Sequence, residues 1–260
     1  MAKYRLAAQL YTVRNFTQNP EDFKATMKRL KKIGYDYAQI SGIGPMAPKD
    51  VRAMMMDAGV APIGCHVDLG TFRSDIRKVV ADCKAWGVDY VAIPWLSRQD
   101  YKTLADWKKL FKEFDGYAKA LKKEGLIVQY HNHAFEFQKF GIKNGAGGKT
   151  ILDMLYEGTR FIQAELDFGW VARGGYDPVT WAKKMKGRLD QVHLKDWGIH
   201  DDQLVIREIG EGSLDWPAII KACKASGTKH FLIEQDNFPM TGDAFKSIAI
   251  SRANLKKMGL

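Results

Sequence analysis

The sequence has few cysteines and no long apolar run. Its three cysteines, Cys65, Cys83 and Cys223, lie far apart and form no Cys-x-x-Cys pair. We therefore expect reduced thiols in a cytoplasmic protein instead of a disulfide framework. No apolar run approaches the roughly 20 residues of a membrane-spanning helix. The chain enters a strand-like segment at once, which indicates no secretory leader, although a chain trimmed of its leader would look the same.

The sequence also lacks a dinucleotide-binding motif and a cluster of basic residues. No Gly-x-Gly-x-x-Gly follows the first predicted strand, so a dinucleotide-binding sheet is not expected. The 40 Lys and Arg outnumber the 30 Asp and Glu, which gives a net charge of +10, but lysine pairs recur along the whole chain. Dispersed lysines are typical of solvated helix faces. We therefore expect no nucleic-acid partner, and the excess charge mildly favours an anionic substrate.

Glycines mark the ends of the predicted helices. Gly34, Gly59, Gly87 and Gly227 each close a helical pattern and precede an apolar, strand-like run, as a left-handed helix cap and a short loop would do. Eight strands are predicted, at residues 6–10, 35–40, 61–66, 90–93, 127–131, 162–166, 191–194 and 231–234. Strands that alternate with helices eight times in 260 residues predict an α/β fold, a single (β/α)8 TIM barrel with residues 1–260 as one domain.

Three predicted strands end in residues that suit a metal ion. Asp167, His193 and Glu234 follow the sixth, seventh and eighth strands, and active sites of this fold lie at such C-terminal ends. Taken singly, Asp167 could cap a turn, His193 could be a satisfied core histidine and Glu234 could pair with Lys195. Three in succession predict convergence on one ion, because buried charges need partners. Carboxylate and imidazole together suit Mn²⁺, Zn²⁺, Mg²⁺ or Co²⁺.

The fifth strand leaves the fourth ligand open. Its end offers His131, His133 and Glu136. Alternation along a strand sends His131 and His133 the same way, and Glu136 lies on the loop beyond. We predict Glu136 as the fourth ligand, with His131 or His133 as catalytic base and Glu234 as a further candidate base. The alternative is a histidine ligand in a shell of two imidazoles and two carboxylates.

Five residues are predicted substrate contacts. His66 ends the third strand, and Lys195 and Asp196 follow His193 at the rim, where a lysine suits a sugar hydroxyl or phosphate. Trp170 and Trp197 lie on loops after the strands, where aromatic faces suit the C–H surfaces of a sugar. A solvated charge or a core aromatic would look the same in sequence.

The chain resembles, over nearly its whole length, the xylose isomerase-like TIM-barrel superfamily, which includes sugar phosphate isomerases/epimerases, D-tagatose 3-epimerase and inosose dehydratase. The resemblance rests on QLYTVR at 9–14, YHNHAFEF at 130–137, DFGW at 167–170, HLKD at 193–196, GEG at 210–212 and IEQD at 233–236. It implies one ion, Mn²⁺ above the others, held by strands five to eight. The HNH run at 131–133 looks more like inosose dehydratase than the glutamate that many epimerases place there, and Trp170 stands where a histidine is common.

We therefore predict a divalent-metal-dependent sugar isomerase/epimerase. It would act on a keto-sugar or sugar phosphate by abstracting the proton next to the carbonyl, through a metal-stabilised enediolate. The alternative is a keto-sugar lyase or dehydratase. An abasic-site endonuclease ranks lower, since six histidines in all do not support a three-zinc cluster. A non-catalytic sugar-binding barrel is a third hypothesis. The expected partner is a small-molecule sugar, and the sequence leaves open whether the protein forms a homo-oligomer.

Overall fold

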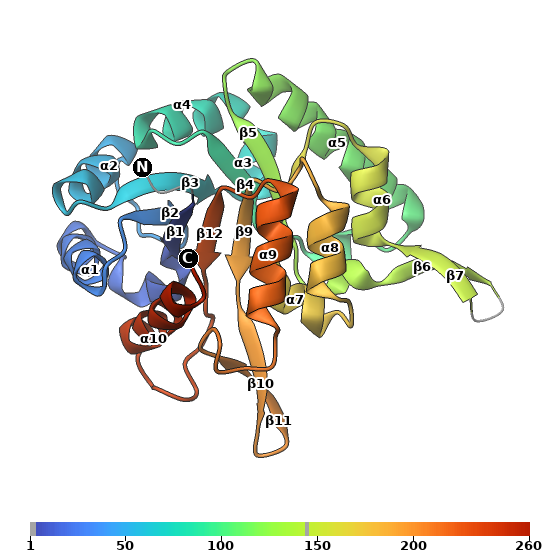
Figure 1. Ribbon diagram of the computed structural model, residues 1–260. Helices are drawn as coiled ribbons and strands as arrows, with labels where there is room; N and C mark the ends of the chain where they lie inside the picture. Colours follow the sequence, from blue (N-terminus) through green and yellow to red (C-terminus); the bar gives the residue numbers. More distant parts are fainter. Residues whose placement is uncertain (1–3, 144–145) are drawn as a thin grey trace.

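Eight parallel strands form a closed barrel in this computed structural model, which describes residues 4–143 and 146–260 (Figure 1). The barrel strands are β1 (Arg5–Gln9), β2 (Tyr37–Ile40), β3 (Ala61–His66), β4 (Tyr90–Ile93), β5 (Ile127–His131), β8 (Gln163–Asp167), β9 (Gln191–Leu194) and β12 (His230–Ile233). They follow one another in this order around the barrel, and β12 closes it by pairing with β1. The predicted (β/α)8 barrel is confirmed, and each barrel strand overlaps its predicted range.

Helices connect the strands and cover the outside of the barrel (Figure 1). They are α1 (Pro20–Ile33), α2 (Pro48–Asp57), α3 (Leu69–Ser74), α4 (Ile76–Trp86), α5 (Leu104–Lys122), α6 (Ile151–Gly158), α7 (Phe168–Arg173), α8 (Pro178–Lys184), α9 (Trp216–Ser226) and α10 (Ala244–Lys257), with short 3₁₀ helices η1 (Leu10–Phe16), η2 (Arg98–Asp100) and η3 (Phe135–Phe137). In α1, Asn19 caps the first turn and Gly34 closes the last with a left-handed φ of 107°. These signals place the helix ends, and hence the short loops into the strands.

The apolar core lies between the helices and the barrel, whereas much of the barrel interior is polar. On α5, Trp107, Leu110 and Phe114 are buried, and each such side chain contributes about 1.5–3 kcal/mol. Inside the barrel, alternate strand residues point inward. These include the fully buried Gln9, Gln39, Gln129, Glu165 and Gln191. Buried polar groups need hydrogen-bond partners. We therefore expect these side chains to hydrogen-bond one another and the polar side chains at the strand ends above them.

Two β-hairpins extend from the loops after the strands and were not predicted. The first pairs β6 (Lys139–Lys143) with β7 (Ala146–Thr150), and the second pairs β10 (Asp196–His200) with β11 (Gln203–Arg207). The second hairpin turns at Asp201 and Asp202, which adopt φ values of 46° and 57°. Asn-Gly and Asp-Gly are the usual sequence signals for such a turn, and this pair of aspartates gave none. Within the described residues, no helix is long and apolar enough to cross a membrane.

Candidate active site

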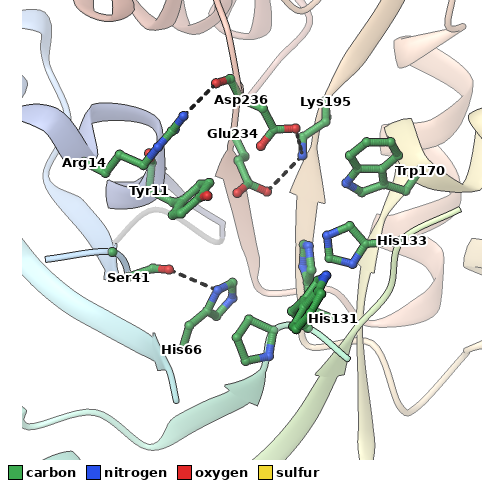
Figure 2. A pocket seen from close by; sticks show the side chains of 13 residues that line it. Tyr11, Arg14, Ser41, His66, His131, His133, Trp170, Lys195, Glu234 and Asp236 are labelled. Atoms are coloured by element: carbon green, nitrogen blue, oxygen red, sulfur yellow. Dashed lines mark hydrogen bonds and ion pairs between the residues drawn. The ribbon is translucent and has the colours of Figure 1, made fainter. Parts of the chain in front are cut away.

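The C-terminal ends of the barrel strands surround an open cavity of about 510 Å³ (Figure 2). Both halves of the barrel contribute to its wall. The lining residues are Tyr11, Arg14, Ser41, Gly42, His66, Pro94, Trp95, His131, His133, Trp170, Lys195, Glu234 and Asp236. Its position is the one that TIM barrels use for their active sites.

Four side chains bring nitrogen and oxygen atoms together at the bottom of this cavity. His131, Asp167, His193 and Glu234 come from the ends of β5, β8, β9 and β12, and their ligand atoms all lie within 4.8 Å of one another. All four residues are buried. Two imidazoles and two carboxylates suit a divalent ion of intermediate hardness. The structure thus brings the predicted Asp167, His193 and Glu234 together and adds His131, the alternative that the sequence left open.

The chemistry of Asp167 supports a cation at this place. Its Oδ1 accepts a hydrogen bond from the backbone N–H of Trp170 and so caps α7. Its Oδ2 is buried and accepts no hydrogen bond from the described residues, although the Lys195 ammonium lies 3.2 Å away. Burial raises the pKa of Asp167 to about 6, against the lowering effect of Lys195. Burying a charged carboxylate oxygen that accepts no hydrogen bond costs free energy unless a further cation neutralises it.

Lys195 lies among three carboxylates beside this group. Its Nζ is 2.8 Å from Asp236, 3.2 Å from Asp167 and 3.4 Å from Glu234. Burial lowers the pKa of Lys195, but the three carboxylates outweigh that effect and raise the pKa above its ordinary value. The ammonium is therefore a fixed positive charge, and it also lies 4.8 Å from the centre of the Trp170 ring. One ammonium does not neutralise three carboxylates, and a divalent ion would.

The structure places Glu136 outside the four-residue group. Glu136 lies in η3, where its carboxylate accepts hydrogen bonds from the Tyr130 hydroxyl at 2.6 Å and from the backbone N–H of His133 at 2.9 Å. Neither set of candidate ligands in the described residues includes it. The 3₁₀ turn after β5 points this carboxylate back toward Tyr130, and the direction of such a turn was not readable from the sequence. In our proposal His131 takes the ligand position predicted for Glu136.

His133 lines the cavity without belonging to the ligand group. Its Nδ1 is buried and has no hydrogen-bond partner in the described residues. Its ring lies 5.4 Å from that of Trp170. Burial, with a smaller effect of Lys195, lowers the pKa of His133 to about 4. The imidazole is therefore neutral at pH 7 and has a nitrogen free to accept a proton.

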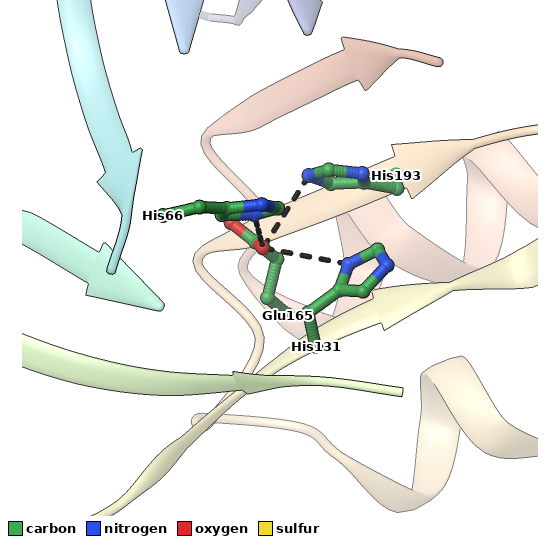
Figure 3. Close-up of side chains that lie close together, drawn as sticks. All are labelled: His66, His131, Glu165 and His193. Atoms are coloured by element: carbon green, nitrogen blue, oxygen red, sulfur yellow. Dashed lines mark hydrogen bonds and ion pairs between the residues drawn. The ribbon is translucent and has the colours of Figure 1, made fainter. Parts of the chain in front are cut away.

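A carboxylate that the sequence analysis missed lies beneath the group (Figure 3). Glu165 Oε2 is 2.7 Å from His66 Nε2, 3.4 Å from His193 Nε2 and 3.5 Å from His131 Nδ1. Burial raises the pKa of Glu165, but the charges of His193 and His66 outweigh it and hold the pKa well below its usual range. These four residues form a second set that could hold an ion. The available signal was the alternation of side chains along a strand, because Glu165 precedes Asp167 by two residues and so points the same way.

Gln39 indicates which set is better prepared for a cation. Its Nε2 donates to Glu165 Oε1 at 2.5 Å, and since a carboxylate only accepts, this contact fixes the amide orientation. Gln39 Oε1 then accepts from His193 Nε2–H at 2.8 Å. The nitrogen left for an ion is His193 Nδ1, which lies 2.8 Å from Glu234 Oε2. Such outer partners fix the ring orientation of metal-binding histidines, so the geometry favours the set with Asp167 and Glu234.

The predicted substrate contacts divide into two groups. His66, Lys195 and Trp170 line the cavity, whereas Asp196 and Trp197 do not. The Asp196 carboxylate is buried and accepts from four backbone N–H groups and from an indole, a set made up of Trp197, Gly210, Gly212, Leu214 and the Trp216 side chain. Trp197 is buried under Arg173, whose guanidinium lies 4.6 Å from the ring centre. Asp196 therefore holds a loop together, and the structure places both Asp196 and Trp197 outside the cavity lining.

Seven cavity residues were not among the predicted site residues. One of them, Asp236, follows β12 beside Glu234. The others are Tyr11, Arg14, Ser41, Gly42, Pro94 and Trp95. They follow β1, β2 and β4, in the half of the barrel whose strands end without an obvious ligand. Their position after a strand was the available signal, and it becomes informative only once the strands are known to close into one ring.

Comparisons with known proteins agree with the barrel fold. A family model described as a xylose isomerase-like TIM barrel matches residues 27–257. Inosose dehydratase 2 of Bacillus cereus is 26% identical over 104 residues, a match that spans 40% of this chain and 33% of that enzyme.

Similar solved structures cover almost the whole chain. A sugar phosphate isomerase/epimerase from Parabacteroides distasonis is 24% identical with a TM-score of 0.81, over 98% of this chain and 94% of that one. An L-ribulose 3-epimerase is 13% identical with a TM-score of 0.73, over 98% and 94% of the two chains. The IOLI protein, whose structure holds a zinc atom, is 16% identical with a TM-score of 0.71, over 98% and 97%. At these identities the likeness shows the shared fold.

Proposed function

Because this chain belongs to the xylose isomerase-like TIM-barrel family, which has epimerase and dehydratase members, we propose that it is a divalent-metal-dependent isomerase or epimerase of a keto-sugar or sugar phosphate. The observation that carries the proposal is the group of two imidazoles and two carboxylates within 4.8 Å of one another at the bottom of the cavity. The proposed partner is a small-molecule sugar, because carboxylates among the lining residues disfavour the phosphate backbone of a nucleic acid.

His131, Asp167, His193 and Glu234 would hold the ion. A bound divalent ion supplies Lewis-acid polarisation of a carbonyl and an adjacent hydroxyl. Mn²⁺ remains our predicted ion, and Zn²⁺ is the first alternative because a second imidazole favours it. Burial lowers the pKa of His193, but the charges of Glu165 and Glu234 outweigh it and raise the pKa to about 10, so a single imidazolium lies between two carboxylates. Binding of a cation would displace this proton.

Proton transfer falls to the residues that the ion leaves free. His133 is neutral, lines the cavity and is the proposed base for the proton next to the carbonyl. The Lys195 ammonium is placed to donate a hydrogen bond to the oxygen on which negative charge develops. His66, from the end of β3, faces the cavity from another side (Figure 2), and its Nδ1 lies 3.2 Å from Ser41 Oγ. A proton can therefore be exchanged from two directions, as epimerisation requires.

A keto-sugar lyase or dehydratase is the second candidate. Its support is the partial likeness to inosose dehydratase and the presence of Lys195 as a donor that could protonate a departing oxygen. Both reactions start with removal of the same proton and differ only in where the next proton goes.

Solvent-deuterium exchange tests the proposal. The full chain, loaded with Mn²⁺ or Zn²⁺, would be incubated in D₂O with ketoses, 3-keto-glycosides and inososes, and the carbon next to the carbonyl followed by NMR. We expect exchange into at least one compound, and a new double bond in the product if the enzyme is a lyase. Absence of exchange with both ions across the panel would contradict the proposal.

Two histidine variants sharpen this test. His133→Gln should abolish exchange while the protein still binds its ion. The matched control is His200→Gln, since His200 lies on the exposed hairpin β10–β11 with a side chain 51% exposed, and this variant should exchange like the wild type.

A further inference from the structure

The cavity has an aromatic wall that the proposed chemistry does not use. Trp95 and Tyr11 line it and are 60% and 39% exposed. Other strongly exposed apolar side chains among the described residues, such as Ile199 on the β10–β11 hairpin, lie outside the cavity. Single exposed apolar side chains are common on protein surfaces. Two aromatic ones on the wall of one polar cavity are what ligand recognition uses.

These aromatic residues come from the half of the barrel that contributes no ligand to the favoured set. Tyr11 follows β1 and Trp95 follows β4, whereas the set with Asp167 and Glu234 comes from β5, β8, β9 and β12. A sugar ring held by that set would leave Trp95 and Tyr11 for another part of the substrate.

The Tyr11 ring is held in place by its neighbours. The Arg14 guanidinium lies 4.3 Å from the ring centre. Gly42 approaches the ring so closely that a Cβ there would lie 2.8 Å from Tyr11 Cδ2, and its φ of 65° also disfavours a side chain. A ring fixed before binding loses little conformational entropy when a ligand stacks on it.

Polar groups beside this wall suit hydroxyl groups. Arg14 donates to the backbone carbonyls of Tyr11 and Asp236 at 2.8 and 3.1 Å. A guanidinium has five N–H donors, so these contacts orient it and leave others for a ligand. The Ser41 hydroxyl lines the same cavity. Aromatic faces next to hydrogen-bond donors match a sugar ring, which has C–H faces and hydroxyl edges.

The cavity also has room for more than one sugar ring. Its volume of about 510 Å³ corresponds to roughly 17 water molecules at about 30 Å³ each. A hexose has fewer heavy atoms than that, and covalent bonds hold them closer together than neighbouring waters. A single ring on the ligand group would therefore leave the outer part of the cavity to solvent.

From these observations we propose that the substrate is a glycoside, whose reacting keto-sugar ring binds at the ligand group while its second ring stacks on Trp95 and Tyr11. This inference rests on the proposed function, which it deepens by naming the substrate class. Trp95, Tyr11 and Arg14 then select for the second ring and take no part in the chemistry.

Binding of glycosides without a carbonyl tests the second-ring site independently of turnover. The probes are methyl β-glucoside, methyl β-cellobioside and methyl maltoside, measured by calorimetry on the full chain loaded with Mn²⁺. We expect at least one methyl disaccharide to bind about 3- to 10-fold more tightly than methyl β-glucoside, the range that an aromatic stacking contact provides. Trp95→Ala and Tyr11→Ala should each remove that gain and leave methyl β-glucoside unchanged.

The matched control is Phe16→Ala, because Phe16 is 44% exposed and lies outside the cavity; it should keep the preference. Equal binding of all three glycosides, no binding of any, or a preference that survives both Trp95→Ala and Tyr11→Ala would overturn the inference. A preference for disaccharides without deuterium exchange in any keto-sugar would contradict the proposed function and leave the second-ring site standing. Deuterium exchange with 3-ketoglucose and 3-ketocellobiose at equal KM would contradict the second-ring site and leave the proposed function standing.

Discussion

The two halves of the barrel mouth carry different kinds of side chain. Strands β5, β8, β9 and β12 end in imidazoles and carboxylates, whereas β1 to β4 end in amides, a hydroxyl, one histidine and aromatic rings. The charged half has an excess of negative charge and a carboxylate oxygen, Asp167 Oδ2, that accepts no hydrogen bond from the part of the chain that the structure describes. Both features suit a cation. The other half has donors and aromatic faces, which suit a sugar. We infer that the first half holds the ion and the base, and that the other half, apart from His66, holds the substrate.

The largest expected effect is in the charged half. Glu234→Gln removes one candidate ligand and a charge partner of both Lys195 and His193. Loss of residues that merely support a ligand weakens metal binding about 10- to 100-fold, so we expect at least that loss here, and deuterium exchange below detection. Exchange at the wild-type rate would remove Glu234 from the site.

The next effect separates two neighbouring histidines of β5 and its loop. His131→Gln should weaken metal binding, because His131 belongs to the ligand group. His133→Gln should leave metal binding unchanged and stop proton exchange. Metal content and exchange rate measured on the same samples distinguish the two, and equal behaviour of the variants would contradict the division of roles.

A smaller effect tests the contact between the halves. Gln39 belongs to β2, yet it hydrogen-bonds both His193 and Glu165. Gln39→Leu should weaken metal affinity about 10- to 100-fold while saturating metal restores most of the exchange rate. An unchanged affinity would show that the halves are independent.

The smallest effect on activity concerns Glu136, whose part is structural in our account. Burial raises its pKa from 4.5 to about 7. Between these values the folded state binds more protons than the unfolded state, so stability falls as pH rises from about 4.5 to 7 and stays lower above it. The loss amounts to about 3 kcal/mol. Glu136→Gln should flatten this part of the stability curve, measured by urea unfolding at several pH values, and a curve parallel to the wild type would contradict the assignment.

Most of the fold could be predicted because local patterns specify it. Apolar runs, glycine caps and early prolines give the strands and helices, and eight repeats in one chain imply closure. The hairpins β6–β7 and β10–β11 are insertions after strands. The turn of β10–β11 lacks the usual residues, whereas the Asn-Gly pair at 144–145, between β6 and β7, was an available signal that was missed.

The site could be predicted only where a strand end by itself reveals chemistry. Asp167, His193 and Glu234 stand directly after apolar runs, so their convergence followed from the barrel. Glu165 was missed because it lies within an apolar run. Only its spacing of two residues from Asp167 indicates that its side chain points into the barrel. Glu136 lies outside the candidate ligand sets and Asp196 outside the cavity lining. Their positions could not be predicted because the path of a loop beyond a strand depends on tertiary contacts, which a single sequence does not show.

Metal binding by the full chain tests the central claim most directly. Calorimetry with Mn²⁺ and with Zn²⁺ would be run on the wild type, on Asp167→Asn and on the surface control His200→Gln. The account predicts one ion per chain with proton release for the wild type and the control, and a loss of affinity of at least about 100-fold for Asp167→Asn. Wild-type protein that binds neither ion, or an Asp167→Asn variant that binds like the wild type, would contradict it.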